Sequence, residues 1–126
     1  MTYLILRIMI NALSIAAAAK LVDGITFTGE WWKMIIIGAV FGIVNSLIKP
    51  FVTLFTFPLI ILTLGLFTLI VNTLMLTITV ELSEPLRLGL QIDGFRSAFK
   101  GALIISIVSL LLSWLTGLKN IKYYRR

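Results

Sequence analysis

The 126-residue sequence lacks two residue types that carry much of protein chemistry, because it contains no cysteine and no histidine. These absences exclude disulfide bonds, a thiol nucleophile, zinc sites built from cysteine or histidine, and imidazole acid–base catalysis. Charge is also scarce: charged residues make up 13% of the chain and hydrophobic residues 60%, whereas soluble domains carry about 25% charged residues. So little polar surface cannot cover a water-soluble domain. The composition predicts one integral membrane domain over residues 1–126.

Long runs without charge locate the membrane spans. Four stretches carry no formal charge, at residues 8–19, 34–48, 50–80 and 101–118. A bilayer core about 30 Å thick takes about 20 apolar helical residues to cross. The first stretch is long enough if its helix includes Arg7, whose side chain can reach the headgroups from near a helix end. We therefore predict four transmembrane helices, at about residues 4–22, 31–48, 59–82 and 96–115.

The third stretch has 31 residues, which as a helix would measure about 46 Å and is too long for one span. Pro50 and Pro58 divide it, because proline disfavours helix at the preceding residue and fits a helix's first turn. We expect residues 50–57 to form an interfacial or re-entrant segment and the third span to begin near Pro58. A basic tail follows at residues 117–126.

The N-terminal run has a competing interpretation as a signal peptide, with a small-x-small cleavage site at residues 16–18. No basic cluster precedes this run, and the second half of the chain contains a counterpart to it. Both observations favour a membrane span that is retained.

The two halves of the sequence resemble each other. Each half consists of a helix, a loop bounded by two glycines, and a second helix; the loops lie at residues 24–29 and 89–94. In both loops apolar side chains recur at every second residue, which predicts short strands that pair or pack together as a cap. With an even number of spans in each half, a duplication predicts parallel repeats related by an axis along the membrane normal. Chance similarity between apolar segments is the alternative.

The net charge of +6 is unevenly distributed. The two glycine-bounded loops and their flanks hold all five acidic residues and five bases. The opposite face holds bases alone, namely Arg7, Lys49, Lys119, Lys122, Arg125 and Arg126. By the positive-inside rule, both termini are expected in the cytoplasm and both loops outside it. The surplus is thus an orientation signal, and the tail bases are expected to contact anionic membrane lipids rather than nucleic acid.

Catalytic signatures are missing. No acidic, lysine or histidine side chain falls in the central part of a predicted span, which disfavours a proton-coupled carrier. We find no phosphate loop, metal cluster or hydrolase nucleophile motif, and loop acids such as Asp23, Glu30 and Asp93 are typical of solvated surface. The sequence predicts a protein that is not an enzyme and needs no cofactor.

The polar groups inside the predicted spans are amides and hydroxyls. The main candidates are Asn11, Asn45, Asn72, Ser106 and Ser109. An asparagine in hydrocarbon requires a hydrogen-bond partner on another helix. The set therefore predicts either a polar stripe that lines a pore or joins two copies, or hydrogen bonds between helices of one chain. The second interpretation is favoured.

A ridge of small residues at Gly38, Gly42 and Ser46 allows close approach of a neighbouring helix. Such ridges serve packing within one chain about as often as they serve a homo-oligomer. The ridge therefore leaves the oligomeric state open.

Several motifs resemble a known family. They are the runs at residues 45–50 (Asn-Ser-Leu-Ile-Lys-Pro), 58–67 (Pro-Leu-Ile-Ile-Leu-Thr-Leu-Gly-Leu-Phe) and 71–76, the Asp-Gly pairs at 23–24 and 93–94, and Arg7 four residues before Asn11. The chain resembles small bacterial membrane proteins grouped with the mycobacteriophage four-span holins, holin superfamily IV. Lys49 stands where arginine is more usual in the family.

This resemblance implies a four-span protein of the bacterial cytoplasmic (inner) membrane, with no catalytic residues to carry over. The holin label implies oligomers that permeabilise the membrane and release a cell-wall hydrolase. Two functions follow as hypotheses: a self-associating, membrane-permeabilising protein, or a structural or envelope-stress accessory that binds lipid or another membrane protein.

Overall fold

The computed structural model describes residues 2–116, so the predicted basic tail at residues 117–126 lies outside the described residues. The chain order is α1 (Thr2–Leu21), β1 (Ile25–Phe27), α2 (Trp31–Leu47), α3 (Lys49–Leu62), α4 (Phe67–Ser83), β2 (Leu90–Ile92) and α5 (Gly94–Thr116). Helices α1, α2 and α5 begin and end within two residues of the helices expected at 4–22, 31–48 and 96–115.

The two strands come from the two glycine-bounded loops and form an antiparallel pair. Ile25 lies opposite Ile92, and Phe27 lies opposite Leu90. Buried and exposed side chains alternate along each strand. Ile25 and Leu90 are each 3% exposed and face the core, whereas the middle residues, Thr26 and Gln91, face outward. The loops also approach closely: a Cβ at Gly89 would lie 2.7 Å from the backbone nitrogen of Gly29.

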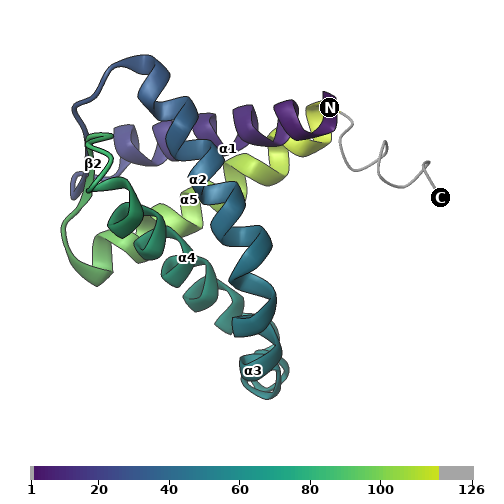
Figure 1. Ribbon diagram of the computed structural model, residues 1–126. Coiled ribbons are helices and arrows are strands. Elements are labelled where there is room, and N and C mark those ends of the chain that lie inside the picture. Colours follow the sequence, from purple (N-terminus) through teal and green to yellow (C-terminus); the bar gives the residue numbers. More distant parts are fainter. Residues whose placement is uncertain (1, 117–126) are drawn as a thin grey trace.

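Four helices surround a common interior (Figure 1). Helix α1 contacts α2 and α5, and α4 contacts the same two helices. The strand pair lies at one end, at the left of Figure 1, where α1 and α4 end and α2 and α5 begin. We call this the strand end. The N-terminus of α1 and the last turns of α5 lie together at the opposite end.

The hydrophobic core lies toward the strand end. Its most deeply buried large side chains are Ile15, Ile37, Met75 and Leu76, each at most 1% exposed. They come from the later turns of α1, the middle of α4 and the first half of α2. Helices α1, α4 and α5 contact the strand pair, and Ile25 and Leu90 belong to the same core, so the core is closed at that end.

The expectation of one continuous helix over residues 59–82 is wrong. Helix α3 begins at Lys49, takes in the whole 50–57 segment and Pro58, and ends at Leu62. Pro58 therefore lies inside a helix rather than at a helix start.

The physical reason is a helix C-cap that follows Leu62. The backbone N–H of Gly65 donates to the carbonyl of Ile60 at 2.7 Å, and that of Leu64 donates to Ile61 at 3.1 Å. This pair of bonds is the Schellman motif, which requires a left-handed residue, and Leu64 has φ of +58°. The cap uses the last carbonyls of α3 and turns the chain. Helix α4 then starts anew, with the N–H of Phe67 donating to Thr63 Oγ1 at 2.9 Å.

Length and composition identify the membrane-crossing elements. In the described range, α1 and α5 are each long and apolar enough to cross a membrane, and α2 with α3 qualifies as a pair bent by 56°. Helix α4 is apolar but has 17 residues. Helix α3 has no buried residue. Its large apolar side chains, such as Leu54 at 71% and Phe55 at 82% exposed, face outward.

Candidate functional site: a polar cavity between the helices

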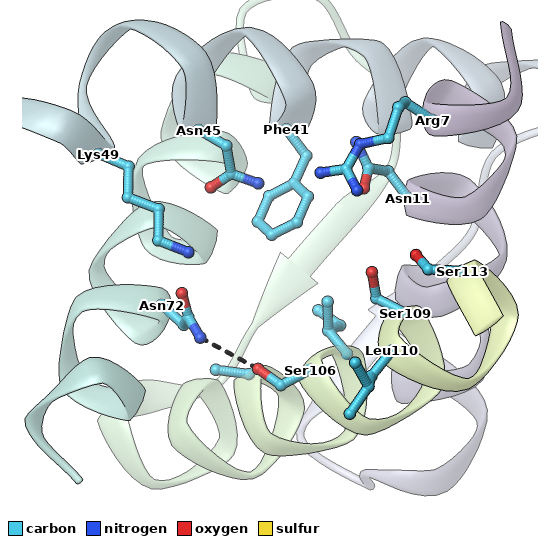
Figure 2. A pocket seen from close by; sticks show the side chains of 12 residues that line it. Arg7, Asn11, Phe41, Asn45, Lys49, Asn72, Ser106, Ser109, Leu110 and Ser113 are labelled. Atoms are coloured by element: carbon cyan, nitrogen blue, oxygen red, sulfur yellow. Dashed lines mark hydrogen bonds between the residues drawn. The ribbon is translucent and has the colours of Figure 1, made fainter. Parts of the chain in front are cut away.

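A polar cavity of about 270 Å³ lies between the helices (Figure 2). Its lining residues include side chains from the first turns of α1 and α4 and the last turns of α2 and α5, so it lies away from the strand end. We call it the central cavity. Each surrounding helix contributes to its wall, as does the first residue of α3. The lining residues are Arg7, Asn11, Phe41, Asn45, Lys49, Asn72, Ala102, Ile105, Ser106, Ser109, Leu110 and Ser113. The sequence candidates Asn11, Asn45, Asn72, Ser106 and Ser109 are thus all brought together here.

Asn11 joins α1 to α2. Its side chain is 3% exposed, and its Nδ2 donates to the carbonyl oxygen of Gly38 at 3.3 Å. The backbones are close at this point, since a Cβ at Gly38 would lie 2.7 Å from the carbonyl oxygen of Ile8. A Cβ at Gly42 would lie 3.2 Å from Asn11 Nδ2. The first two residues of the small-residue ridge are therefore used for contact within the chain.

Asn72 makes the corresponding link between α4 and α5. Its Nδ2 donates to Ser106 Oγ at 3.1 Å, the bond drawn in Figure 2. The hydroxyls of Ser109 and Ser113 follow along the same face of α5 and point into the central cavity in Figure 2.

Asn45 differs from the other two asparagines. Its Oδ1 atom is buried and has no hydrogen-bond partner among the described residues. A buried acceptor without a partner costs about 1–3 kcal/mol. Asn45 also lines the central cavity, with Oδ1 itself covered by neighbouring atoms.

Two cations also face the central cavity. Arg7 from α1 and Lys49 from the α2–α3 junction are both partly buried, and Figure 2 shows both side chains reaching toward its centre. Within residues 2–116, no acidic side chain lines the cavity. The five acids of the chain lie in or beside the loops at the strand end. The central cavity is therefore positively charged.

A second hollow, which we call the lateral groove, lies between the first turns of α1 and the last turns of α2. It has a volume of about 670 Å³. Arg7, Asn11, Asn45 and Lys49 line both the groove and the central cavity. The rest of the groove includes exposed apolar side chains, among them Leu4 at 55%, Ile43 at 57% and Leu47 at 63% exposed.

Sequence reasoning treated Arg7 and Lys49 as markers of orientation and missed their place in this site. The available signal was spacing. Arg7 precedes Asn11 by four residues, and Lys49 follows Asn45 by four, so each cation shares a helix face with an amide. Ser46, the third residue of the ridge, lines the groove and is exposed. Lys119, Lys122, Arg125 and Arg126 lie outside the described residues.

The apolar helices with outward-facing leucine, isoleucine and phenylalanine define a multi-pass membrane protein. A family model described as mycobacterial 4 TMS phage holin, superfamily IV, matches residues 2–111. The chain belongs to this family, as its motifs indicated, and is a holin-like membrane protein.

Two relatives support the assignment. An uncharacterized protein of Streptomyces coelicolor is 46% identical over 110 residues, covering 83% of this chain and 88% of the relative. The uncharacterized membrane protein YvlD of Bacillus subtilis is 33% identical over 105 residues, covering 83% of this chain and 85% of the relative. No solved structure is significantly similar to the chain.

Proposed function

We propose that this chain is a resident four-span protein of the bacterial cytoplasmic membrane, with α1, α2, α4 and α5 as the spans. Four spans match the description of its family. Helix α4 would measure about 26 Å, slightly less than the hydrocarbon core. Helix α3, apolar and exposed, would lie in the cytoplasmic leaflet.

The distribution of charge supports a cytoplasmic location for both termini and an outer location for the strand pair. All five acids lie at the strand end, and Arg7 and Lys49 lie away from it. The chain has no native cysteine, so single cysteines can report the topology. In spheroplasts, a membrane-impermeant maleimide should label Thr26→Cys and leave Thr2→Cys unlabelled. The reverse pattern would contradict this orientation.

The order helix–strand–helix occurs twice. In each half an asparagine of the first helix donates to the second helix, Asn11 to Gly38 and Asn72 to Ser106. We infer from this correspondence that the halves are parallel repeats.

The function that the site supports best is binding of lipid or another membrane protein, without enzymatic activity and without opening the bilayer. One observation carries this proposal: the polar side chains of the helices gather at a cavity within one chain, and Arg7, Asn45 and Lys49, which also line the lateral groove, are partly buried. Asn11 and Asn72 have partners inside the chain, and Gly38 is covered by α1. A pore between copies would need such groups on the outer surface.

Expression in bacteria with a potential-sensitive dye tests this function. Membrane potential and growth should stay unchanged at high expression, because the polar groups remain inside each folded chain. Depolarisation at a fixed expression level would contradict the proposal.

A second candidate function is holin-like permeabilisation by self-association. It is favoured by the apolar surface of α3, whose exposed Phe51, Leu54 and Phe55 offer a contact for another copy. Co-expression with a cytoplasmic cell-wall hydrolase separates the two functions. Abrupt lysis would support permeabilisation, and continued growth would support the resident, non-pore function.

A further inference from the structure

We propose that the central cavity binds the phosphate group of a hydroxyl-bearing phosphate ester, held by Arg7 and Lys49. This inference deepens the proposed function and rests on it, since it names the ligand of a lipid-binding membrane protein. The matching chemistry is that of an anionic glycerophospholipid headgroup, which a soluble glycerol phosphate shares.

The charge of the central cavity favours an anion. Arg7 and Lys49 reach the same cavity from different helices, and no described acidic side chain lines it. Two like charges repel in a partly buried, low-dielectric site, and a bound anion would offset that repulsion. Guanidinium binds phosphate through two parallel hydrogen bonds, and lysine adds a point charge.

The neutral groups narrow the class of anion. Asn45 Oδ1 is a buried acceptor without a described partner. Rotation of the Asn45 side chain would bring this oxygen into the cavity, where a fully ionised phosphate has no proton to donate to it but a glycerol or sugar hydroxyl has. The hydroxyls of Ser109 and Ser113 can donate to phosphate oxygens from the opposite wall (Figure 2). The donor and acceptor set thus matches a phosphate with hydroxyls attached.

The lateral groove supplies the route and the place for a hydrocarbon chain. Arg7 and Lys49 stand where the groove meets the central cavity. Leu4, Ile43 and Leu47 line the groove and are more than half exposed. A headgroup in the cavity would leave its acyl chains in this apolar groove. The cavity of about 270 Å³ suits a headgroup rather than a whole lipid.

The test measures binding to the purified full-length chain in a neutral detergent. Native mass spectrometry would compare dioleoyl phosphatidylglycerol with dioleoyl phosphatidylcholine. The double variant Arg7→Gln/Lys49→Gln should weaken binding of phosphatidylglycerol by about tenfold or more, because two charge-assisted contacts are lost. The matched control Lys20→Gln/Lys100→Gln removes two exposed cations near the strand end and should change binding by no more than about twofold.

Competition distinguishes the source of the phosphate. Displacement of phosphatidylglycerol by millimolar glycerol 3-phosphate would identify a soluble ester as sufficient, whereas binding that glycerol 3-phosphate leaves intact would identify the lipid. Both results support the site. Equal binding by the cavity variant and its control would overturn it, as would equal affinity for phosphatidylcholine.

A second measurement avoids dependence on folding of the variant. Wild-type chain exposed to phosphatidylglycerol with a photoreactive headgroup should be labelled within the first turns of α1 and at the α2–α3 junction. Labelling confined to the strand end would overturn the proposal. Because these experiments use purified protein, they fail independently of the membrane-potential measurement in cells.

Discussion

The strand end of this protein and the opposite end, which holds the central cavity and which we call the cavity end, are built from the same four helices, α1, α2, α4 and α5. The two ends differ in what fills the space between these helices. At the strand end, Ile15, Ile37 and Leu76 are at most 1% exposed and the strand pair closes the core. At the cavity end, amides, hydroxyls and two cations surround an open volume. In a bilayer, tight packing stabilises helix association while polar groups are costly. We infer that the strand end holds the fold together and the cavity end carries the function.

The largest expected effect is loss of core packing at the strand end. Ile37→Ala should lower the free energy of unfolding by about 2–5 kcal/mol, because Ile37 is 0% exposed and its removal leaves a cavity. The measurement is unfolding by SDS titration in mixed micelles. Ile36→Ala is the matched control, since Ile36 is 38% exposed and faces outward. Equal effects at the two positions would show that packing inside the strand end is not the main source of stability.

The next effect tests the contact between α1 and α2, where the two ends meet. Gly38→Ala should destabilise the fold by about 1–3 kcal/mol, because the new methyl group would lie 2.7 Å from the carbonyl oxygen of Ile8 and push the helices apart. Gly42→Ala is the control, since its Cβ would meet a side-chain atom, Asn11 Nδ2, at 3.2 Å. The same unfolding assay applies. A larger loss for Gly42→Ala than for Gly38→Ala would contradict this account of the ridge.

The cavity end should respond in the opposite direction. Asn45→Leu should raise the free energy of unfolding by about 1 kcal/mol, because it replaces a buried acceptor without a partner by an apolar group of similar size. The variant should also bind phosphatidylglycerol more weakly, which would show function and stability in opposition. Asn72→Leu is the control, and it should bring no gain because Asn72 donates to Ser106. A destabilised Asn45→Leu would mean that the cavity end also supports the fold.

Of the five helices within residues 2–116, the sequence could predict three closely, because charge-free runs ended by charged or glycine-bounded loops mark α1, α2 and α5 directly. It failed at residues 59–82 because Pro58 was taken as a helix start, whereas the break follows Leu62. The left-handed residue at this break is Leu64, a residue type that carries no local signal for such a conformation. Only Gly65 beside it marked a turn.

The amides and hydroxyls of the candidate site were predicted from the sequence, whereas the place of its two cations was not. Asn11, Asn45 and Asn72 stood out because an amide in an apolar run needs a partner. Whether that partner lies in the same chain depends on how helices distant in sequence are brought together, and no local pattern contains that information. Arg7 and Lys49 were interpreted as orientation signals and as parts of the family motifs, although their spacing from Asn11 and Asn45 placed each on the polar face.

The smallest expected effect concerns the link between α4 and α5 beside the central cavity. A double-mutant cycle with Asn72→Ala and Ser106→Ala should give a coupling energy of about 0.6 kcal/mol, the average for hydrogen bonds between membrane helices. The cycle uses the SDS titration assay, with Ser109→Ala in place of Ser106→Ala as the control pair, which should couple by close to zero. So small a coupling, next to the multi-kilocalorie loss at Ile37, would mean that the cavity end can be remodelled without unfolding the protein. A coupling comparable to the Ile37 effect would instead make the polar face of α5 part of the core that the strand end provides.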